Sequence, residues 1–158
     1  MEETTFILYE GLELHSQETY TPTDIDIIEF GMKWDPYPFH TDSEAAKNTF
    51  FGELIAPGVM TDSILIKLAH KLSPQFPDDA VLGMIGAESV RYIKPVKPGQ
   101  ELSSHGVVVS LEQSKSNRGQ AIMKVEWEIK TSEIVVIYNR TNVLLVSSKY
   151  CCFTDNPK

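Results

Sequence analysis

Apolar residues in the first half of the chain recur at three- and four-residue spacings, which is the period of an amphipathic helix. Ile25, Ile28 and Met32 share one face of a helix that we predict from about Pro22 to Lys33. Thr21 stands where an N-cap is expected, because proline suits the first helical position that follows it. Gly31 should weaken this helix, since glycine is a poor helix former.

A longer apolar stripe follows the dipeptide Pro57-Gly58 and predicts the most buried helix of the protein. Its apolar positions are Val59, Met60, Ile64, Leu65, Leu68 and Leu72, and the stripe is widened by Ile66 and Ala69. This helix should end before Pro74. Upstream of it, Thr41 and Glu44 have the spacing of a capping box, which predicts a short helix ending near Gly52.

Beyond residue 80 the pattern changes to the alternation that is typical of β-strands. Four long strands are predicted within residues 81–96, 101–113, 120–131 and 132–147, joined by short polar turns. Thr5 to Leu14 forms a shorter strand candidate, interrupted at Gly11, and Trp127 should face the core because it alternates with charged residues. These elements predict an α+β domain, in which a curved antiparallel meander wraps around the long apolar helix.

The length of 158 residues suits a single domain with its own core, and no repeat, linker or low-complexity tract divides it. We predict one domain over residues 1–158, with its core at about 5–148 and a short C-terminal tail at 149–158. Fourteen basic and twenty-two acidic side chains give a net charge of −8, which argues against nucleic acid as a partner.

Nothing in the chain predicts secretion or membrane insertion. The N-terminus lacks a basic region followed by an apolar one, and no apolar run approaches the roughly 20 residues that cross a bilayer. Cys151 and Cys152 are adjacent, so they form neither a disulfide framework nor a C-x-x-C metal motif. We expect a cytoplasmic protein with two reduced thiols and no membrane partner.

Chemistry-bearing residues concentrate in the loop from Trp34 to Ser43, WDPYPFHTDS. Pro36 and Pro38 fix φ at alternate positions, which stiffens the bridge between Asp35 and His40. A carboxylate and an imidazole at a set separation can exchange protons near neutral pH with little conformational freedom to lose. The same two residues could instead act as helix caps or dipole partners, so the loop alone leaves both roles open.

Gly58 is a second candidate, because its backbone N–H lies at the start of an apolar helix, where the dipole favours a developing negative charge such as an enolate oxygen. Tight packing before the helix would explain the same glycine. One histidine among scattered aspartates offers no clustered ligand set, so we expect no metal site. His15 and His105 have no partner that the sequence identifies, and His70 should face the polar side of the long helix.

Three motifs, DPYPFHTD, FFGELIAPGVMT and RYIKPVKPGQEL, follow one another at spacings that resemble the MaoC-like branch of the hotdog fold, the family of (R)-specific enoyl-CoA hydratases and acyl dehydratases. The resemblance runs from about Thr19 to Val146. The family's hydratase motif is an Asp, any residue, Asn, Pro, an aliphatic residue and His, followed after eighteen residues by a Gly that opens the central helix. Asp35, Pro38 and His40 keep this spacing, and Gly58 lies 18 residues beyond His40.

The chain departs from the family pattern at three positions. Trp34 replaces a small residue, Tyr37 replaces the Asn that helps to shape the site, and Pro57 replaces a His before the helix glycine. By the resemblance, Trp34 could narrow the acyl pocket, and Tyr37 could fill the space of the missing amide. These changes bear on the substrate more than on the proton chemistry, because both Asp35 and His40 remain.

The resemblance implies reversible hydration of a trans-2-enoyl thioester to a 3-hydroxyacyl thioester. Asp35 and His40 would act together on one water, and the Gly58 N–H would bind the thioester oxygen as it becomes enolate-like. Ser63 is a further candidate for lining the pocket. The resemblance implies no metal and no organic cofactor, because the substrate itself carries CoA or a phosphopantetheine arm.

Such an anionic arm needs local positive charge on an acidic protein. Arg91, Lys94 and Lys97 lie in one stretch and could supply it, although a solvated sheet edge would explain them equally well. Hotdog proteins usually pair edge to edge and place the thioester tunnel at the seam, so the resemblance implies a homodimer or a higher homo-oligomer.

Two other functions fit the same fold. A hotdog thioesterase would need a carboxylate that activates water at the carbonyl carbon, and Asp62 and Glu53 are the nearby candidates. A non-catalytic acyl-CoA-binding module would explain the departures at Trp34, Tyr37 and Pro57. The survival of both proton-transfer residues favours the hydratase, because a binding module has no use for them.

Overall fold

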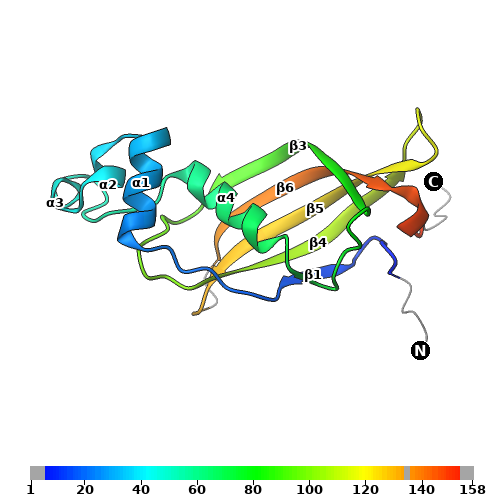
Figure 1. The fold of residues 1–158 in the computed structure, drawn as a ribbon, viewed down its shortest axis with the longest axis horizontal. Coiled ribbons are helices and arrows are strands. Elements are labelled where there is room, and N and C mark those ends of the chain that lie inside the picture. Colours follow the sequence, from blue (N-terminus) through cyan, green and yellow to red (C-terminus); the bar gives the residue numbers. More distant parts are fainter. Residues whose placement is uncertain (1–5, 134–135, 154–158) are drawn as a thin grey trace.

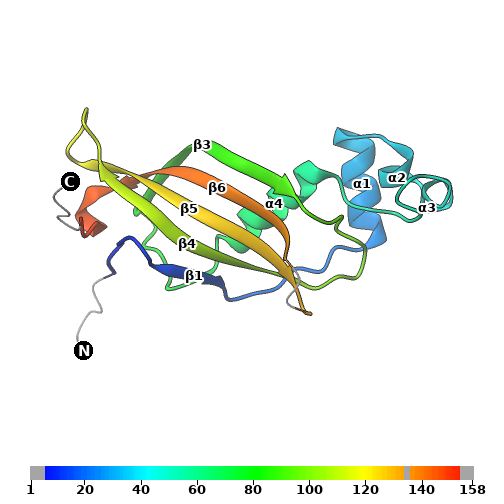
Figure 2. The ribbon, with the colours of Figure 1, turned by 180° about the vertical axis from the view of Figure 1, so that it is seen from behind.

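The computed structural model describes residues 6–133 and 136–153. A curved antiparallel sheet packs on one side of helix α4, as Figures 1 and 2 show from opposite faces. The elements are β1 (Glu13–Ser16), α1 (Asp24–Trp34), α2 (Pro38–Thr41), α3 (Ser43–Ala46), α4 (Gly58–Leu68), β2 (Leu72–Ser73), β3 (Val81–Tyr92), β4 (Leu102–Gln113), β5 (Gln120–Thr131), β6 (Val136–Ser147) and the 3-10 helix η1 (Ser148–Tyr150). The predicted α+β hotdog architecture is therefore confirmed.

The sheet has the strand order β2-β1-β4-β5-β6-β3, and all neighbouring pairs are antiparallel. β4, β5 and β6 form the predicted meander, but β3 pairs with β6 at the far edge and not with β4. The prediction that all four long strands follow one another in the sheet is wrong for this reason. Pro95 and Pro98 lie in the β3–β4 connection, and neither has the N–H that a tight hairpin ladder would need.

Helix α4 begins at Gly58, as predicted, and supplies one side of the core. Its buried residues are Met60, Thr61, Ile64, Leu65 and Leu68. Val59 and Ile66, which the sequence places in the buried stripe, are 50% and 42% exposed. Only one face of the helix meets the sheet within the protomer, so the buried stripe is narrower than the apolar stripe.

The inner face of the sheet is built by the expected alternation. Trp127 faces the core and is 3% exposed, as predicted. Its ring packs on Gly106 of β4, where an added Cβ would lie 2.6 Å from ring atoms. Leu14 of β1 pairs with Gly106 and is fully buried, so Leu14, Gly106 and Trp127 define the face that meets α4.

Helices α1, α2 and α3 lie beyond one end of the sheet (Figures 1 and 2). The N-cap of α1 is Thr23 and not Thr21, because the Thr23 side chain and Asp26 form a reciprocal capping box. Ile27 and Gly31 are its buried residues, whereas Ile25 and Met32 are each 67% exposed. Of the predicted apolar face, Ile28 packs against the core, whereas Ile25 and Met32 remain largely exposed in the described part of the protomer.

Two predicted element boundaries need correction. The capping box at Thr41 and Glu44 is wrong, since Asp42 caps α3 by accepting hydrogen bonds from the backbone N–H groups of Glu44 and Ala45. Among residues 6–14 of the predicted strand, regular structure starts at Glu13, because Gly11 has a φ of +92° and turns the chain; Thr5 lies outside the described residues.

Residues near the two ends of the described range meet at the other end of the sheet. Leu8 forms an isolated parallel bridge with Cys151, and its backbone N–H donates to the Tyr150 carbonyl at 2.7 Å. Residues 148–153 thus lie against the domain, and the rest of the predicted tail, 154–158, lies outside the described residues. In the described ranges, no helix has the length and apolar character that a bilayer crossing would require.

Candidate active site

The two proton-transfer candidates lie at the junction of α1 and α2. Asp35 is the C-cap of α1, and its backbone N–H donates to the Gly31 carbonyl at 2.9 Å. His40 is the third residue of α2, which begins with Pro38. The Tyr37 N–H donates back to the Asp35 carbonyl at 2.8 Å, so the bridge between the pair is a tight, proline-stiffened turn, as the sequence predicts.

The His40 ring is buried, and its hydrogen bonding determines its tautomer. Nδ1 lies 2.7 Å from the carbonyl oxygen of Ile55. Because a carbonyl only accepts, Nδ1 carries the proton, and in the neutral ring the lone pair is on Nε2. Nε2 faces the Asp35 carboxylate, with 3.5 Å between Nε2 and Oδ2. Two proton acceptors therefore face each other across a gap that is longer than an ordinary hydrogen bond.

The backbone around His40 is held from two sides. On the α1 side, Gly31 lies so close that an added Cβ would be 2.6 Å from the His40 carbonyl oxygen. On the other side, the Ile55 N–H donates to the Phe39 carbonyl at 3.0 Å, and the Phe39 ring meets the His40 ring edge-on at 4.4 Å. The imidazole is therefore positioned by main-chain contacts and one aromatic neighbour.

Trp34 and Tyr37 lie near the pair in the chain but face solvent, being 65% and 59% exposed. Lys33 Nζ lies 5.1 Å from the centre of the Trp34 ring, and the Tyr37 ring stacks on Phe39 at 5.4 Å. Tyr37 thus supports the ring that supports His40. Within the protomer neither side chain encloses an acyl pocket, so their predicted effect on the substrate stays a prediction.

Gly58 opens α4, and Pro57 before it provides no side-chain cap. An added Cβ at position 58 would lie 2.9 Å from the Tyr92 ring, so the glycine is needed for packing whatever else it does. The Tyr92 hydroxyl donates to Asp62 Oδ2 at 2.9 Å, one turn further along the helix. Tyr92 therefore joins the start of α4 to an acidic residue on the same helix.

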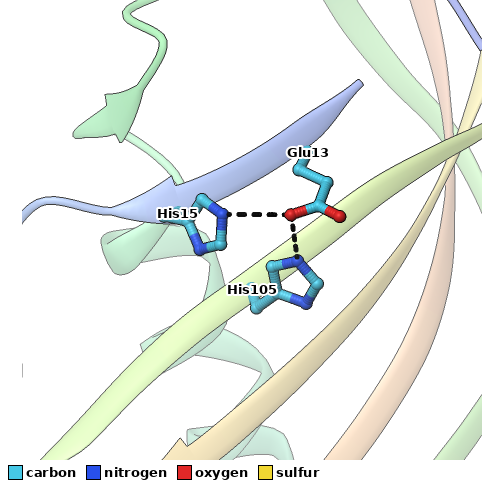
Figure 3. Close-up of side chains that lie close together, drawn as sticks. All are labelled: Glu13, His15 and His105. Atoms are coloured by element: carbon cyan, nitrogen blue, oxygen red, sulfur yellow. Dashed lines mark ion pairs between the residues drawn. The ribbon is translucent and has the colours of Figure 1, made fainter. Parts of the chain in front are cut away.

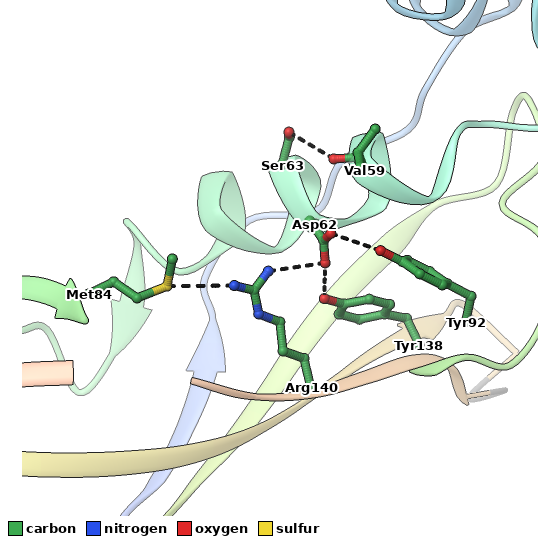
Figure 4. A network of polar contacts seen from close by, with 7 residues as sticks. All are labelled: Val59, Asp62, Ser63, Met84, Tyr92, Tyr138 and Arg140. Carbon is green, nitrogen blue, oxygen red and sulfur yellow. Dashed lines mark hydrogen bonds and ion pairs between the residues drawn. The ribbon is translucent and has the colours of Figure 1, made fainter. Parts of the chain in front are cut away.

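Asp62 is the centre of a polar network between α4 and the sheet (Figure 4). Its Oδ1 accepts from the Tyr138 hydroxyl and lies 3.1 Å from Arg140 Nη1. Burial, and then the hydrogen bond to Asp62, raises the pKa of Tyr92 to about 12 and raises the pKa of Tyr138 still further. Both phenols are therefore neutral donors to the carboxylate at physiological pH.

Sequence analysis missed this network, although a signal for it was present. Tyr138, Arg140 and Asn142 share one face of β6 by the period of two, and that face is buried at Tyr138. An arginine on a buried face predicts an acidic partner, because an unpaired buried charge is energetically costly. Sequence analysis considers Asp62 as a thioesterase candidate, whereas in the structure its carboxylate is engaged by Tyr92, Tyr138 and Arg140.

The remaining predicted site residues are dispersed. Ser63 lies on the opposite side of α4 from Asp62 (Figure 4), and its hydroxyl donates to the Val59 carbonyl at 3.0 Å. The structure shows no contact of Ser63 with the Asp35–His40 pair among the described residues. Lys97 forms an ion pair with Glu53. Arg91 near the end of β3 and Lys94 just beyond it are both exposed.

An apolar cavity of about 430 Å³ lies between the C-terminal half of α4 and the sheet. Its lining includes Leu14, Ile66, Ala69, Met123, Trp127 and Leu144. Ile66 is eight residues beyond Gly58, which is about 12 Å along a helix. Neither Asp35 nor His40 lines this cavity, so within one protomer the cavity and the pair do not form one pocket.

Comparison with known proteins agrees with this architecture. The family model described as "MaoC like domain" matches residues 10–131. A UPF0336 protein of Streptomyces avermitilis is 32% identical over 120 residues, covering 70% of this chain and 78% of the relative.

Two solved structures extend the likeness to three dimensions. The MaoC-like dehydratase from Rhodospirillum rubrum has a TM-score of 0.78 at 28% identity, covering 89% of this chain and 93% of that one. The (R)-hydratase from A. caviae involved in PHA biosynthesis has a TM-score of 0.67 at 20% identity, covering 87% of this chain and 96% of that one, which shows a shared fold. By its sequence match and by its fold, this chain belongs to the MaoC-like domain family.

Proposed function

We propose that this protein is a hydratase/dehydratase that interconverts a trans-2-enoyl thioester and a 3-hydroxyacyl thioester. The observation that carries the proposal is the geometry of the Asp35–His40 pair. A neutral imidazole lone pair and a carboxylate face each other at 3.5 Å, close enough for one water to donate a hydrogen bond to each. A water held by two acceptors is oriented and activated for addition to an electron-poor carbon.

In the hydration direction, the water oxygen forms a bond to the β-carbon and loses one proton to the pair. The π electrons of the enoyl group move toward the thioester oxygen, and the α-carbon then takes a proton, so that water is added across the double bond. The pair supplies both proton steps. The Gly58 N–H at the start of α4 would stabilise the charge on the thioester oxygen.

The substrate proposed here carries CoA or a phosphopantetheine arm, and the reaction uses no other cofactor. Arg91 and Lys94 are exposed cations at the end of β3 and suit the phosphates of such an arm. Lys97 suits it less well, because its ammonium already pairs with Glu53.

We also propose that the working form is a homodimer built on β3. This strand is an edge of the sheet, twelve residues long, and most of its side chains are exposed. Its large exposed apolar residues are Val81, Leu82, Met84, Ile85, Val90 and Tyr92. The edge of a sheet presents unpaired backbone N–H and C=O groups, which can pair with another strand. If β3 of a second copy paired with it in the antiparallel sense, the backbone groups of both edges would be hydrogen-bonded.

The structure weighs against the thioesterase alternative. That reaction needs a carboxylate free to activate water at the carbonyl carbon. Asp62 is instead engaged by Tyr92, Tyr138 and Arg140, and Glu53 is engaged by Lys97.

Turnover of short, medium and branched trans-2-enoyl-CoAs tests the proposal through the loss of enoyl-thioester absorbance. Asp35→Asn and His40→Asn should each lower kcat by about 10²–10⁴-fold, the usual contribution of a general acid–base group. Glu29→Gln makes the same kind of change at an exposed position of α1 and should leave kcat unchanged. Parent-level turnover in Asp35→Asn would refute the assigned pair. Thiol release with the enoyl group intact would indicate a thioesterase, and tight binding without turnover a binding module.

A further inference from the structure

Two histidines to which the sequence assigns no partner meet on the outer face of the sheet (Figure 3). β1 and β4 are paired with His15 directly opposite His105 and Glu13 opposite Val107. Because side chains alternate along a strand, Glu13 and His15 emerge on one face, and His105 joins them from the neighbouring strand. Leu14 between them points into the core, so this face is the one turned away from α4.

The distances within this cluster do not suit direct hydrogen bonds. Glu13 Oε2 lies 3.5 Å from His15 Nε2 and 3.7 Å from His105 Nε2. Both separations exceed the 2.7–3.2 Å that is usual for a hydrogen bond to oxygen. They instead approach the separation of about 3.3–3.4 Å between two ligand atoms of a tetrahedral zinc ion, given zinc–ligand bonds of about 2.0–2.1 Å.

We propose that Glu13, His15 and His105 form a binding site for a zinc-like divalent transition-metal ion. The three ligand atoms lie within 4.8 Å of one another, so small side-chain rotations bring all of them onto one ion. Two imidazoles and one carboxylate are a ligand set that zinc uses with an open fourth position. Calcium and magnesium, which take oxygen ligands, fit it poorly.

The surroundings favour a cation at this place. The three residues lie on hydrogen-bonded strands, so their backbone positions are set before any ion arrives. His105 is only 24% exposed, and its ring lies against the His15 ring at a tilt, with 4.7 Å between ring centres, which restricts both rings. Glu128 of β5 is directly opposite His105 but pairs with Lys130 at 2.9 Å, so the negative charge within the cluster comes from Glu13, and the net charge of −8 adds a general attraction for cations.

A bound ion would connect β1 to β4 through side chains as well as through the backbone. β1 has only four residues, and its other neighbour, β2, has only two. Metal binding at this edge would therefore stabilise the N-terminal strand of the sheet. The site is independent of the proposed hydratase, because it lies on the face of the sheet away from α4.

Titration of zinc against a competing chelator tests the site, using full-length protein stripped of metal and free of any histidine tag. The adjacent thiols of Cys151 and Cys152 are a second place where zinc could bind, so the titration uses the Cys151→Ser, Cys152→Ser background. We expect one zinc ion per chain. Loss of an outer partner already lowers metal affinity by about 10–100-fold, so loss of a direct ligand in His15→Ala or His105→Ala should cost at least tenfold.

Matched variants decide the outcome. Glu13→Gln should weaken binding, because it replaces the anionic ligand with a neutral one of the same shape. His70→Ala removes an exposed histidine just beyond the end of α4, whose Nδ1 lies 2.7 Å from the Ile66 carbonyl, and it should leave binding unchanged. Circular dichroism confirms that each variant is folded. The proposal is overturned if the cysteine-free protein binds no zinc, or if His15→Ala and His105→Ala bind it as tightly as their parent.

Discussion

Gly31 is the point at which α1 touches the backbone of His40, and its replacement with alanine should separate activity from stability. An added Cβ would lie 2.6 Å from the His40 carbonyl oxygen, 2.9 Å from its Cβ and 3.1 Å from its carbonyl carbon. Comfortable contacts begin at about 3.5 Å, so α2 must move away by roughly 0.5–1 Å. The atoms in the way belong mainly to the backbone, so no side-chain rotation can relieve the contact.

The two effects of this substitution on stability oppose each other. Alanine gains about 1 kcal/mol over glycine inside a helix. Overpacking of a tight contact costs about 1–3 kcal/mol, so the free energy of unfolding should fall by no more than about 2 kcal/mol. Activity has no such compensation, because a catalytic group displaced by about 1 Å can lose up to about 10²-fold in rate. We therefore expect kcat to fall by about 10–100-fold in a protein that remains folded.

The measurement pairs enoyl-CoA turnover with urea unfolding on the same preparations. Glu29→Ala is the control, because it places an alanine at an exposed position of the same helix. It reports the effect of a new alanine in α1 without a steric clash. Parent-level kcat in Gly31→Ala would show that the contact with the His40 backbone does not position the imidazole, and the reasoning would fail.

Three further changes test other parts of the structure. Asp62→Ala leaves the Arg140 guanidinium without its partner between α4 and the sheet, and should lower the free energy of unfolding by about 2–4 kcal/mol in urea titrations. Burial, and then Asp62, raises the pKa of Tyr92 from 10.0 to about 12, so its contribution to stability is complete below pH 10 and is lost between pH 10 and 12. Thermal unfolding should show that loss, and Tyr92→Phe should reduce it. Ile85→Lys adds charge to the exposed edge of β3 and should convert the dimer to monomers in analytical ultracentrifugation, whereas an unchanged sedimentation coefficient would contradict the proposed interface.

The regular elements of this fold could be predicted because their periods are local. Alternation along residues 120–131 predicts Trp127 on the core face, and the apolar stripe after Gly58 predicts a helix that starts near Gly58, where α4 begins. The partner of β3 could not be predicted in this way. Strand pairing depends on where a connection leads. The sequence predicts a strand through Pro95 and a short polar turn after it, whereas β3 ends at Tyr92 and residues 93–101 cross to β4.

The exposed apolar residues of α1 show a second limit of prediction from sequence. Ile25 and Met32 form an apolar face by spacing, yet both are largely exposed, because α1 lies beyond the end of the sheet. A period tells which residues share a face but not whether another element covers it. If β3 pairs with a second copy, as proposed, a partner could cover part of this face.

In the candidate site too, contacts between residues close in the sequence could be predicted, and contacts between distant residues could not. The spacing of Asp35 and His40 within one loop was enough to predict that they lie together, and the structure places them 3.5 Å apart. The protonation of the ring was not predictable, because its partner is a main-chain carbonyl fifteen residues away in a segment without periodicity. Asp62 and Arg140, 78 residues apart, were likewise beyond any local pattern.

The hydrogen bond from His40 to the Ile55 carbonyl also has an evolutionary consequence. Every amino acid offers the same carbonyl oxygen, so the tautomer of His40 does not depend on which side chain occupies position 55. Histidines oriented by a carboxylate lose their tautomer when that one residue mutates. In this protein the side chain at position 55 can change while the His40 imidazole keeps its proton on Nδ1. Homologues with different residues at position 55 should therefore have the same histidine tautomer.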